Sequence, residues 1–188
     1  MAEGERLRVL AFSGSLRAAS LNTALLRAAV ELAPDTMTIE IFGLDRLPLY
    51  DEDLEKSGDP EGVAAWKAAI AAADALLIAC PEYNFGISGV LKNAIDWASR
   101  PPGRSSILGK PTAIIGASPG SGATRLAQAM TRQILSALAV PVMPLPFFQL
   151  GQAGDKVQDG VVTDERTREL LTRVLRGIET WTRRLASA

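Results

Sequence analysis

The stretch Pro81-Glu82-Tyr83-Asn84-Phe85-Gly86-Ile87 joins two segments of different character. It follows the unbroken apolar run Ala75–Cys80, which is typical of a central strand covered on both faces. It precedes residues 88–97, whose apolar side chains recur at helical spacing. The sequence here therefore predicts a buried strand, a stiff polar-aromatic turn and a helix. In an open α/β sheet, ligands bind at the carboxyl ends of the strands, so we expect this turn to be the floor of a site for a planar ligand.

The same alternation of strand and helix extends along the chain. The pattern predicts strands at 7–12, 37–42, 75–80, 110–117 and 140–145 and helices at 21–32, 62–73, 88–97, 126–138 and 165–185. Leu44–Pro60 is expected to be a long surface loop, and Leu126, Met130, Ile134 and Leu138 stand four residues apart in their helix. Prolines in 140–145 favour an edge strand. Together these elements predict one domain over residues 1–188, an α/β three-layer sandwich with a parallel sheet.

The bulk composition excludes several classes of function. The formal net charge of the 188 residues is −1, so no basic surface is predicted that would attract nucleic acid or a membrane. The chain has no histidine, which excludes a serine–histidine triad and a histidine metal site. A single cysteine, Cys80, fits a reducing, cytoplasmic location. The charged start Met1–Arg6 is not expected to be a signal peptide, and no apolar run is long enough to span a membrane.

The loop after the first predicted strand has the composition of an anion site. It leads from a strand into a helix, so backbone N–H groups and the helix dipole face whatever binds there. It has one glycine, Gly14, whereas a dinucleotide fingerprint needs several. Its side-chain donors, which suit the three oxygens of a phosphate monoester, are those of Ser13, Ser15, Arg17, Ser20 and Asn22. The alternative is an ordinary helix cap beside a solvated arginine.

The turn at 81–87 combines a rigid backbone, aromatic side chains and polar groups that could contact a planar ligand. Pro81 fixes the chain as it leaves the strand, and Tyr83 and Phe85 are placed to pack near a ring. The Asn84 amide and local backbone N–H groups can reach polar ring edges. Glu82 has a second interpretation, as an acceptor for backbone N–H groups. The alternative for the whole turn is packing in the core or at the surface.

A third loop, Ser118–Gly122, follows the fourth predicted strand. Its glycines leave room for the backbone to lie against a flat ligand, although an ordinary strand-to-helix turn has the same composition. Cys80 is expected to pack in the core and not to serve as a redox group.

Together, these stretches resemble the NAD(P)H-dependent FMN reductase family, including its quinone- and chromate-reducing members. The matching patterns are G-S-L-R-x-x-S-x-N over residues 14–22 and P-E-Y-N over residues 81–84, which leads into Lys92-Asn93-Ala94-Ile95-Asp96-Trp97. The likeness covers nearly the whole chain, and the two motifs are specific in this order and at this separation. The third loop departs from the family at Ala123, where a second consecutive glycine is common.

The resemblance implies a flavodoxin-like fold with strand order 2-1-3-4-5 and one FMN per subunit. It implies that the cofactor lies against three sets of residues: Ser13, Ser15, Leu16, Arg17, Ser20 and Asn22 at the phosphate, Pro81, Glu82, Tyr83 and Asn84 at the isoalloxazine, and Ser118 and Gly120 at its far edge. Family members are homodimers or dimers of dimers with the active site near an interface. Val90 and Trp97, which lie off the main apolar stripe of their helix, suggest a second apolar face for such contacts, and the alternative is simply a well-buried helix.

The resemblance also implies the reaction. NADPH or NADH would pass hydride to the flavin, and a small acceptor such as a quinone, free flavin, chromate or an azo compound would take its place. A protein without histidine can do this because the flavin carries the chemistry. Tyr83 or water would deliver protons. The alternatives are a flavodoxin-type electron carrier, against which the near-zero net charge argues, and a non-catalytic flavin-binding module.

Overall fold

Strand β3 (Ala75–Ala79) lies at the centre of the sheet, and each of its side chains is buried. The computed structural model describes residues 6–187; residues 1–5, which carry most of the predicted charged start, and residue 188 lie outside the described part. On one side β3 pairs with β1 (Leu7–Ser13) and on the other with β6 (Thr112–Ala117), both in parallel. The outer strands are β2 (Met37–Phe42) and β7 (Phe148–Leu150), giving the order β2-β1-β3-β6-β7. This order is the predicted 2-1-3-4-5.

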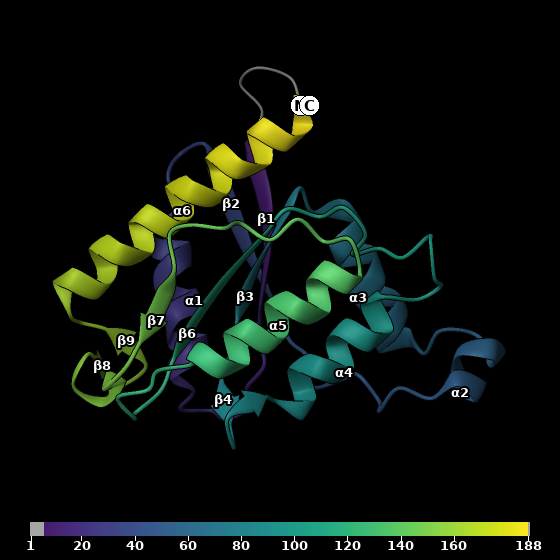
Figure 1. Ribbon diagram of the computed structural model, residues 1–188, viewed down its shortest axis with the longest axis horizontal. Helices are drawn as coiled ribbons and strands as arrows, with labels where there is room; N and C mark the ends of the chain where they lie inside the picture. The colour runs from purple at the N-terminus through teal and green to yellow at the C-terminus, as the bar shows by residue number, and fades with distance from the viewer. Residues whose placement is uncertain (1–5, 188) are drawn as a thin grey trace.

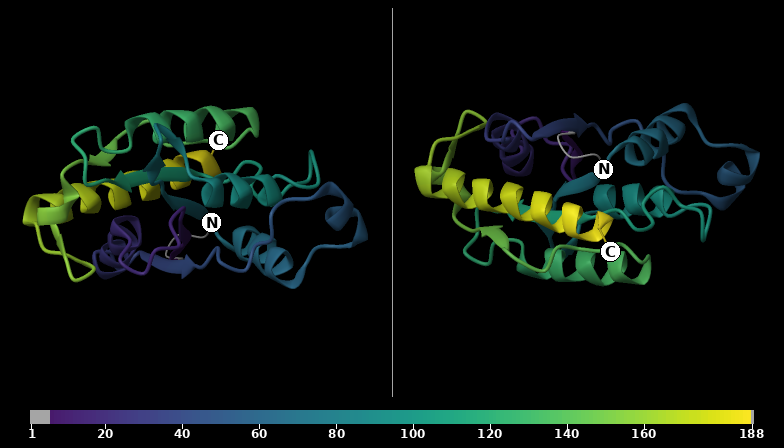
Figure 2. Two further views of the ribbon diagram at one scale, coloured as in Figure 1. Left: turned by 90° about the horizontal axis from the view of Figure 1, so that it is seen from below. Right: turned by 90° about the horizontal axis from the view of Figure 1, so that it is seen from above.

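Helices cover both faces of the sheet, as predicted for a three-layer sandwich (Figures 1 and 2). One face packs against α1 (Leu21–Glu31) and α6 (Glu165–Ala186), and the other packs against α3 (Glu61–Ala72), α4 (Gly89–Ala98) and α5 (Arg125–Ala137). Successive residues of a strand point to opposite faces, so Leu77 packs on the α1 and α6 side while Ile78 packs on the other.

The last strand is shorter and later than the sequence predicts. Residues 140–145 form no strand, and β7 begins only at Phe148. One bridge, between Thr112 and Val142, is all that joins 140–145 to β6 as strand partners. Pro141, Pro144 and Pro146 have no N–H to donate to a neighbouring strand, so this segment runs beside β6 without a regular ladder.

The segment Leu44–Pro60 contains a helix, α2 (Glu52–Ser57), where a loop alone was predicted. Asp51 caps it by accepting a hydrogen bond from the Asp53 N–H at 2.8 Å. The described chain also has two short antiparallel ribbons and one 3-10 turn: β4 (Glu82–Tyr83) with β5 (Gly86–Ile87), β8 (Val157–Gln158) with β9 (Val161–Val162), and η1 (Ala153–Asp155).

Of the two interpretations of helix α4, the structure shows the well-buried helix. Trp97 is fully buried, its Nε1 donates to the Pro48 carbonyl at 2.9 Å, and Val90 is partly buried against the same core. Asn93 donates to the same carbonyl, so α4 holds segment 44–50 over itself. In α5 the side chains of Leu126 and Met130 are 52% and 42% exposed, and the buried face is formed by Ala127, Gln128, Thr131 and Leu135. Among residues 6–187, no helix is long and apolar enough to cross a membrane.

The close packing of β6 on α5 gives a test of the fold. A methyl group on Gly116 would collide with the Thr124 hydroxyl and would lie 2.6 Å from the Cys80 carbonyl oxygen. We expect Gly116→Ala to lower the free energy of unfolding of the ligand-free protein by about 1–3 kcal/mol, measured by urea denaturation. Gly89→Ala is the matched control, because nothing lies within 4 Å of its added methyl group. An unchanged midpoint for Gly116→Ala would contradict this packing.

Candidate functional site

Three loops meet at the carboxyl ends of β1, β3 and β6 and enclose a hollow of about 250 Å³. Its lining comes from all three predicted loops and consists of Ser15, Arg17, Ser20, Leu21, Asn22, Pro81, Glu82, Tyr83, Ala117, Ser118 and Pro119. Ser13 and Leu16 line an adjoining hollow, which shares Ser15 and Arg17 with the first. Asn84 and Gly120 are the two predicted site residues that line neither.

Gly14 brings the first loop against the second. Its N–H donates to the Ala79 carbonyl at 3.0 Å, and its own carbonyl accepts from the Ser88 hydroxyl at 2.8 Å. A methyl group on Gly14 would lie 2.8 Å from Cδ of Pro81, closer than carbon atoms normally approach. Glycine is therefore needed here for the two loops to touch.

The first loop combines helix capping with free donors. Ser20 caps α1 by accepting from the Thr23 N–H at 3.2 Å, and the Ser13 oxygen accepts from the Ser15 N–H at 3.2 Å. The alternative prediction of a helix cap is therefore confirmed for Ser20. Because both serine oxygens act as acceptors in these bonds, each hydroxyl still has its hydrogen to donate to a ligand. Arg17 is exposed and makes no ion pair within the described residues. Its guanidinium is free to bind an anion at the start of α1.

Asn22 joins the first loop to the third. Its side chain is buried, and its Nδ2 donates to the Ala117 carbonyl while its Oδ1 accepts from the Ala117 N–H, both at 3.0 Å. These bonds tie α1 to the end of β6 and leave one amide hydrogen for a ligand. Sequence reasoning did not find this partner, because Ala117 is 95 residues away and its backbone groups carry no side-chain signal.

The second loop is a hairpin formed by β4 and β5. Tyr83 is 48% exposed and lines the hollow, whereas Phe85 is 77% exposed and does not line it. Asn84 and Phe85, at the tip, have φ of 49° and 63°, which is the left-handed region. Glu82 accepts hydrogen bonds through Oε2 from the N–H groups of Leu126 and Ala127, at 2.9 and 3.0 Å. Its second predicted role, as an acceptor for backbone N–H groups, is therefore confirmed.

The third loop is held by backbone hydrogen bonds to the end of β7 and to residues 152 and 153 after it. The Ser118 N–H donates to the Leu150 carbonyl at 2.9 Å, and the Ser118 oxygen accepts from the Gly120 N–H at 3.2 Å. Ala123 has φ of 55°. Glycine adopts this conformation without strain, so Ala123 occupies a position whose backbone favours glycine.

Cys80 packs in the core, as predicted. Burial raises the pKa of its thiol to about 11, although a hydrogen bond with Thr131 acts in the opposite direction. The thiol is therefore protonated at neutral pH and is a poor nucleophile.

The donor set fits a flavin mononucleotide. The lining combines the donors of Arg17, the serine hydroxyls and the start of α1 with the less polar Pro81, Tyr83 and Pro119, which suit a ring. Within residues 6–187, no group of three or more acidic or cysteine side chains is arranged to hold a metal ion.

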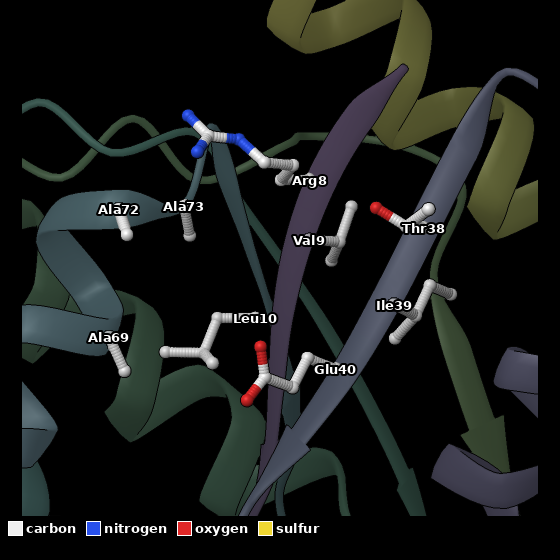
Figure 3. Close-up of a pocket in the computed structure, with 9 residues that line it drawn as sticks. All are labelled: Arg8, Val9, Leu10, Thr38, Ile39, Glu40, Ala69, Ala72 and Ala73. Carbon is white, nitrogen blue, oxygen red and sulfur yellow. The ribbon is translucent and has the colours of Figure 1, made fainter.

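Another hollow, of about 350 Å³, lies away from this edge, on β1 and β2 beside α3 (Figure 3). Its floor includes Ala69, Ala72 and Ala73, and its one cation, Arg8, is already in an ion pair with Asp74. Although this hollow is larger, it lacks the convergent donors of the three-loop site.

Comparison with known proteins agrees with this geometry. A family model described as NADPH-dependent FMN reductase matches residues 7–155. An NAD(P)H-dependent FMN reductase of Pseudomonas aeruginosa is 44% identical over 180 residues, which cover 95% of this chain and 97% of that protein. An NADPH:quinone oxidoreductase of Arabidopsis thaliana is 43% identical over 188 residues, with 95% and 93% of the two chains covered.

A solved structure has the same fold over nearly the whole chain. It is the flavoenzyme NAD(P)H:(acceptor) oxidoreductase FerB of Paracoccus denitrificans, which is 36% identical. Its TM-score is 0.86, and the match covers 95% of this chain and 98% of FerB. The resemblance seen in the two sequence motifs is thereby confirmed: the chain belongs to the NADPH-dependent FMN reductase family, and it is an oxidoreductase.

Proposed function

We propose that this chain holds one FMN in the three-loop hollow and passes hydride from NADPH or NADH to quinones, free flavin or similar small acceptors. The observation that carries the proposal is the meeting of Arg17 and the start of α1 with Tyr83 and Pro119 around one hollow. When bound, FMN supplies the two-electron chemistry. The residues of the chain bind it, orient it and limit access to it.

The phosphate is assigned to the first loop. Arg17 offers a fork of N–H donors, and Ser15 and Ser20 offer hydroxyls next to the free N–H groups of α1. Ser13 and Leu16 border this end from the adjoining hollow. Asn22 acts chiefly through Ala117, by fixing the first loop against the third.

The ring is assigned to the space between the second and third loops. Pro81 and Tyr83 bound one side, and Ser118 bounds the other, with Gly120 behind it through its hydrogen bond to Ser118. Asn84 is exposed next to Tyr83, where it can reach only the outer edge of a ligand. The Tyr83 hydroxyl lines the hollow and is the proposed proton donor, with water as the alternative.

A second copy of the chain is the proposed partner, in a dimer or a dimer of dimers. The exposed apolar residues Tyr83, Phe85, Leu126 and Met130 form what we call the α5 face. The hairpin lies on this helix, since a methyl group on Gly86 would be 3.5 Å from the Met130 sulfur. Helix α5 contains no acidic residue, which is unusual for a helix with an exposed side and typical of an interface. The single buried cysteine supports a cytoplasmic location.

The proposed activity predicts flavin reduction by nicotinamide cofactors. We expect added FMN to bind, its absorbance at about 450 nm to bleach on mixing with NADPH or NADH without oxygen, and the colour to return with a quinone. Stopped-flow absorbance, followed by steady-state assays with a quinone panel, provides the measurement. Bound flavin that neither NADPH nor NADH reduces would favour an electron carrier. Protein that binds no flavin would contradict the proposal altogether.

The assignment of Arg17 to the phosphate has a specific consequence. We expect Arg17→Ala to weaken FMN binding about 10- to 100-fold, because charge-assisted hydrogen bonds are worth about 1.5–3 kcal/mol. Riboflavin, which has no phosphate, is the matched control ligand, and its affinity should be the same in both proteins. Quenching of flavin fluorescence at fixed salt measures all four constants. Equal losses for FMN and riboflavin would show that Arg17 does not contact the phosphate.

The proposed interface predicts that a charge on the α5 face separates the subunits. We expect Met130→Glu to weaken self-association at least about 10-fold, because an unpaired carboxylate would be buried between the copies. Sedimentation velocity over a concentration series measures this. Val30→Glu places the same charge at a 43% exposed position on α1 and should leave association unchanged. Wild-type association retained in Met130→Glu would remove the α5 face from the interface.

A further inference from the structure

Helix α5 begins without a cap of its own. Its N-cap residue, Thr124, makes no capping hydrogen bond, and its buried hydroxyl oxygen accepts from Nε2 of Gln128 at 2.9 Å. The N–H groups of Leu126 and Ala127 in the first turn donate to one oxygen of Glu82 instead. The cap of α5 is therefore supplied by a residue from another loop, 44 positions before Leu126 in the chain.

The hairpin that carries Glu82 has little to hold its own shape. Its strands pair at two positions, Glu82 with Ile87 and Tyr83 with Gly86. Both tip residues, Asn84 and Phe85, are in the left-handed region, which asparagine tolerates but which is unfavourable for a bulky residue such as Phe85. A two-stranded ribbon of this size is marginal in water even without such a tip. The contacts between this hairpin and α5 must therefore provide much of the stability that keeps the hairpin folded.

Glu82 stands where the two walls of the proposed ring site meet. Tyr83, the next residue, lines the hollow from the hairpin, and Ser118 and Pro119 line it from the loop that leads into α5. The Glu82 side chain lines the hollow as well. Its two hydrogen bonds thus join the hairpin to the helix that follows the third loop.

We infer that Glu82 is a positioning residue. Through these two hydrogen bonds it holds the hairpin wall of the proposed ring site in place before the flavin binds. The inference rests on the proposed FMN site. The role requires an acceptor oxygen of the right reach, and the negative charge adds only a modest further stabilisation at the start of α5. Glutamine keeps an oxygen at the same distance from the backbone, whereas alanine removes it.

The inference predicts a difference between two substitutions. We expect Glu82→Ala to weaken FMN binding about 10-fold or more, and Glu82→Gln to stay within about three-fold of the wild type, measured by flavin fluorescence quenching. In the flavin-free protein, we expect hydrogen exchange of residues 83–87 and of the Leu126 and Ala127 amides to be faster in Glu82→Ala and close to wild type in Glu82→Gln. This second measurement needs neither flavin nor activity.

A matched control separates positioning from a general loss of stability. Asp164 caps α6 by accepting from the Thr167 N–H at 2.7 Å and does not line the hollow. We expect Asp164→Ala to lower the unfolding midpoint with FMN affinity and hairpin exchange unchanged. Should Glu82→Ala fail to fold, Glu82→Asp, whose carboxylate is one methylene shorter, should show the same weakened binding and faster exchange.

Each outcome decides the inference. Wild-type affinity and exchange in Glu82→Ala, or in its aspartate substitute, would overturn it. Losses in Glu82→Gln as large as those in Glu82→Ala would also overturn it, because the hydrogen bonds would then not be what matters. If the wild-type protein bound no FMN, the proposed function would fail instead, while the exchange measurement would still test whether Glu82 orders the hairpin.

Discussion

The parallel pairing of β1 with β3 is the constraint on which the rest of the site depends. Ser13 is in register with Ala79, so the two strands end at the same level and their loops leave the sheet side by side. Gly14 then lets these loops touch, with a hydrogen bond to Ala79 and another from Ser88. A polar loop and an aromatic hairpin, 60 or more residues apart in the sequence, thereby face one hollow.

Polar side chains, two of them buried, hold this arrangement together. Asn22 joins the first loop to the third, Ser88 joins the second to the first, and Glu82 joins the second to α5. Each of the three is matched to backbone groups that would otherwise lack partners, which is how a polar residue is stabilised near the interior. The walls of the hollow are thus set by the protein alone. A flavin would enter a preformed slot, which lowers the cost of ordering on binding.

Most strands of the sheet were predictable, because the burial of a strand requires apolar residues in a recognisable pattern along the sequence. The apolar run of β3 and the alternating residues of β2 indicate a central and an edge strand, and the structure confirms both. Secondary structure was predicted wrongly where the local sequence pattern gives a misleading or weak signal. The apolar segment 140–145 contains prolines and forms no ladder, and the short α2 has no buried residue whose spacing would reveal it. In α5, small and polar residues pack inward on β6, leaving Leu126 and Met130 outside.

The sequence by itself determined the alternation of strands and helices, the two family motifs and the types of donor in each loop. All three depend on local periodicity and on residue identity, which can be read directly from a single sequence. Only the tertiary structure decided which donors face the hollow and which are occupied in holding the loops. Asn22 looks like a ligand in the sequence, yet its amide is matched to Ala117. Glu82 has two interpretations in the sequence, and the folded chain shows that it both lines the hollow and caps a distant helix. The physical reason is that their partners are backbone groups, which every residue has and which only the folded chain brings within reach.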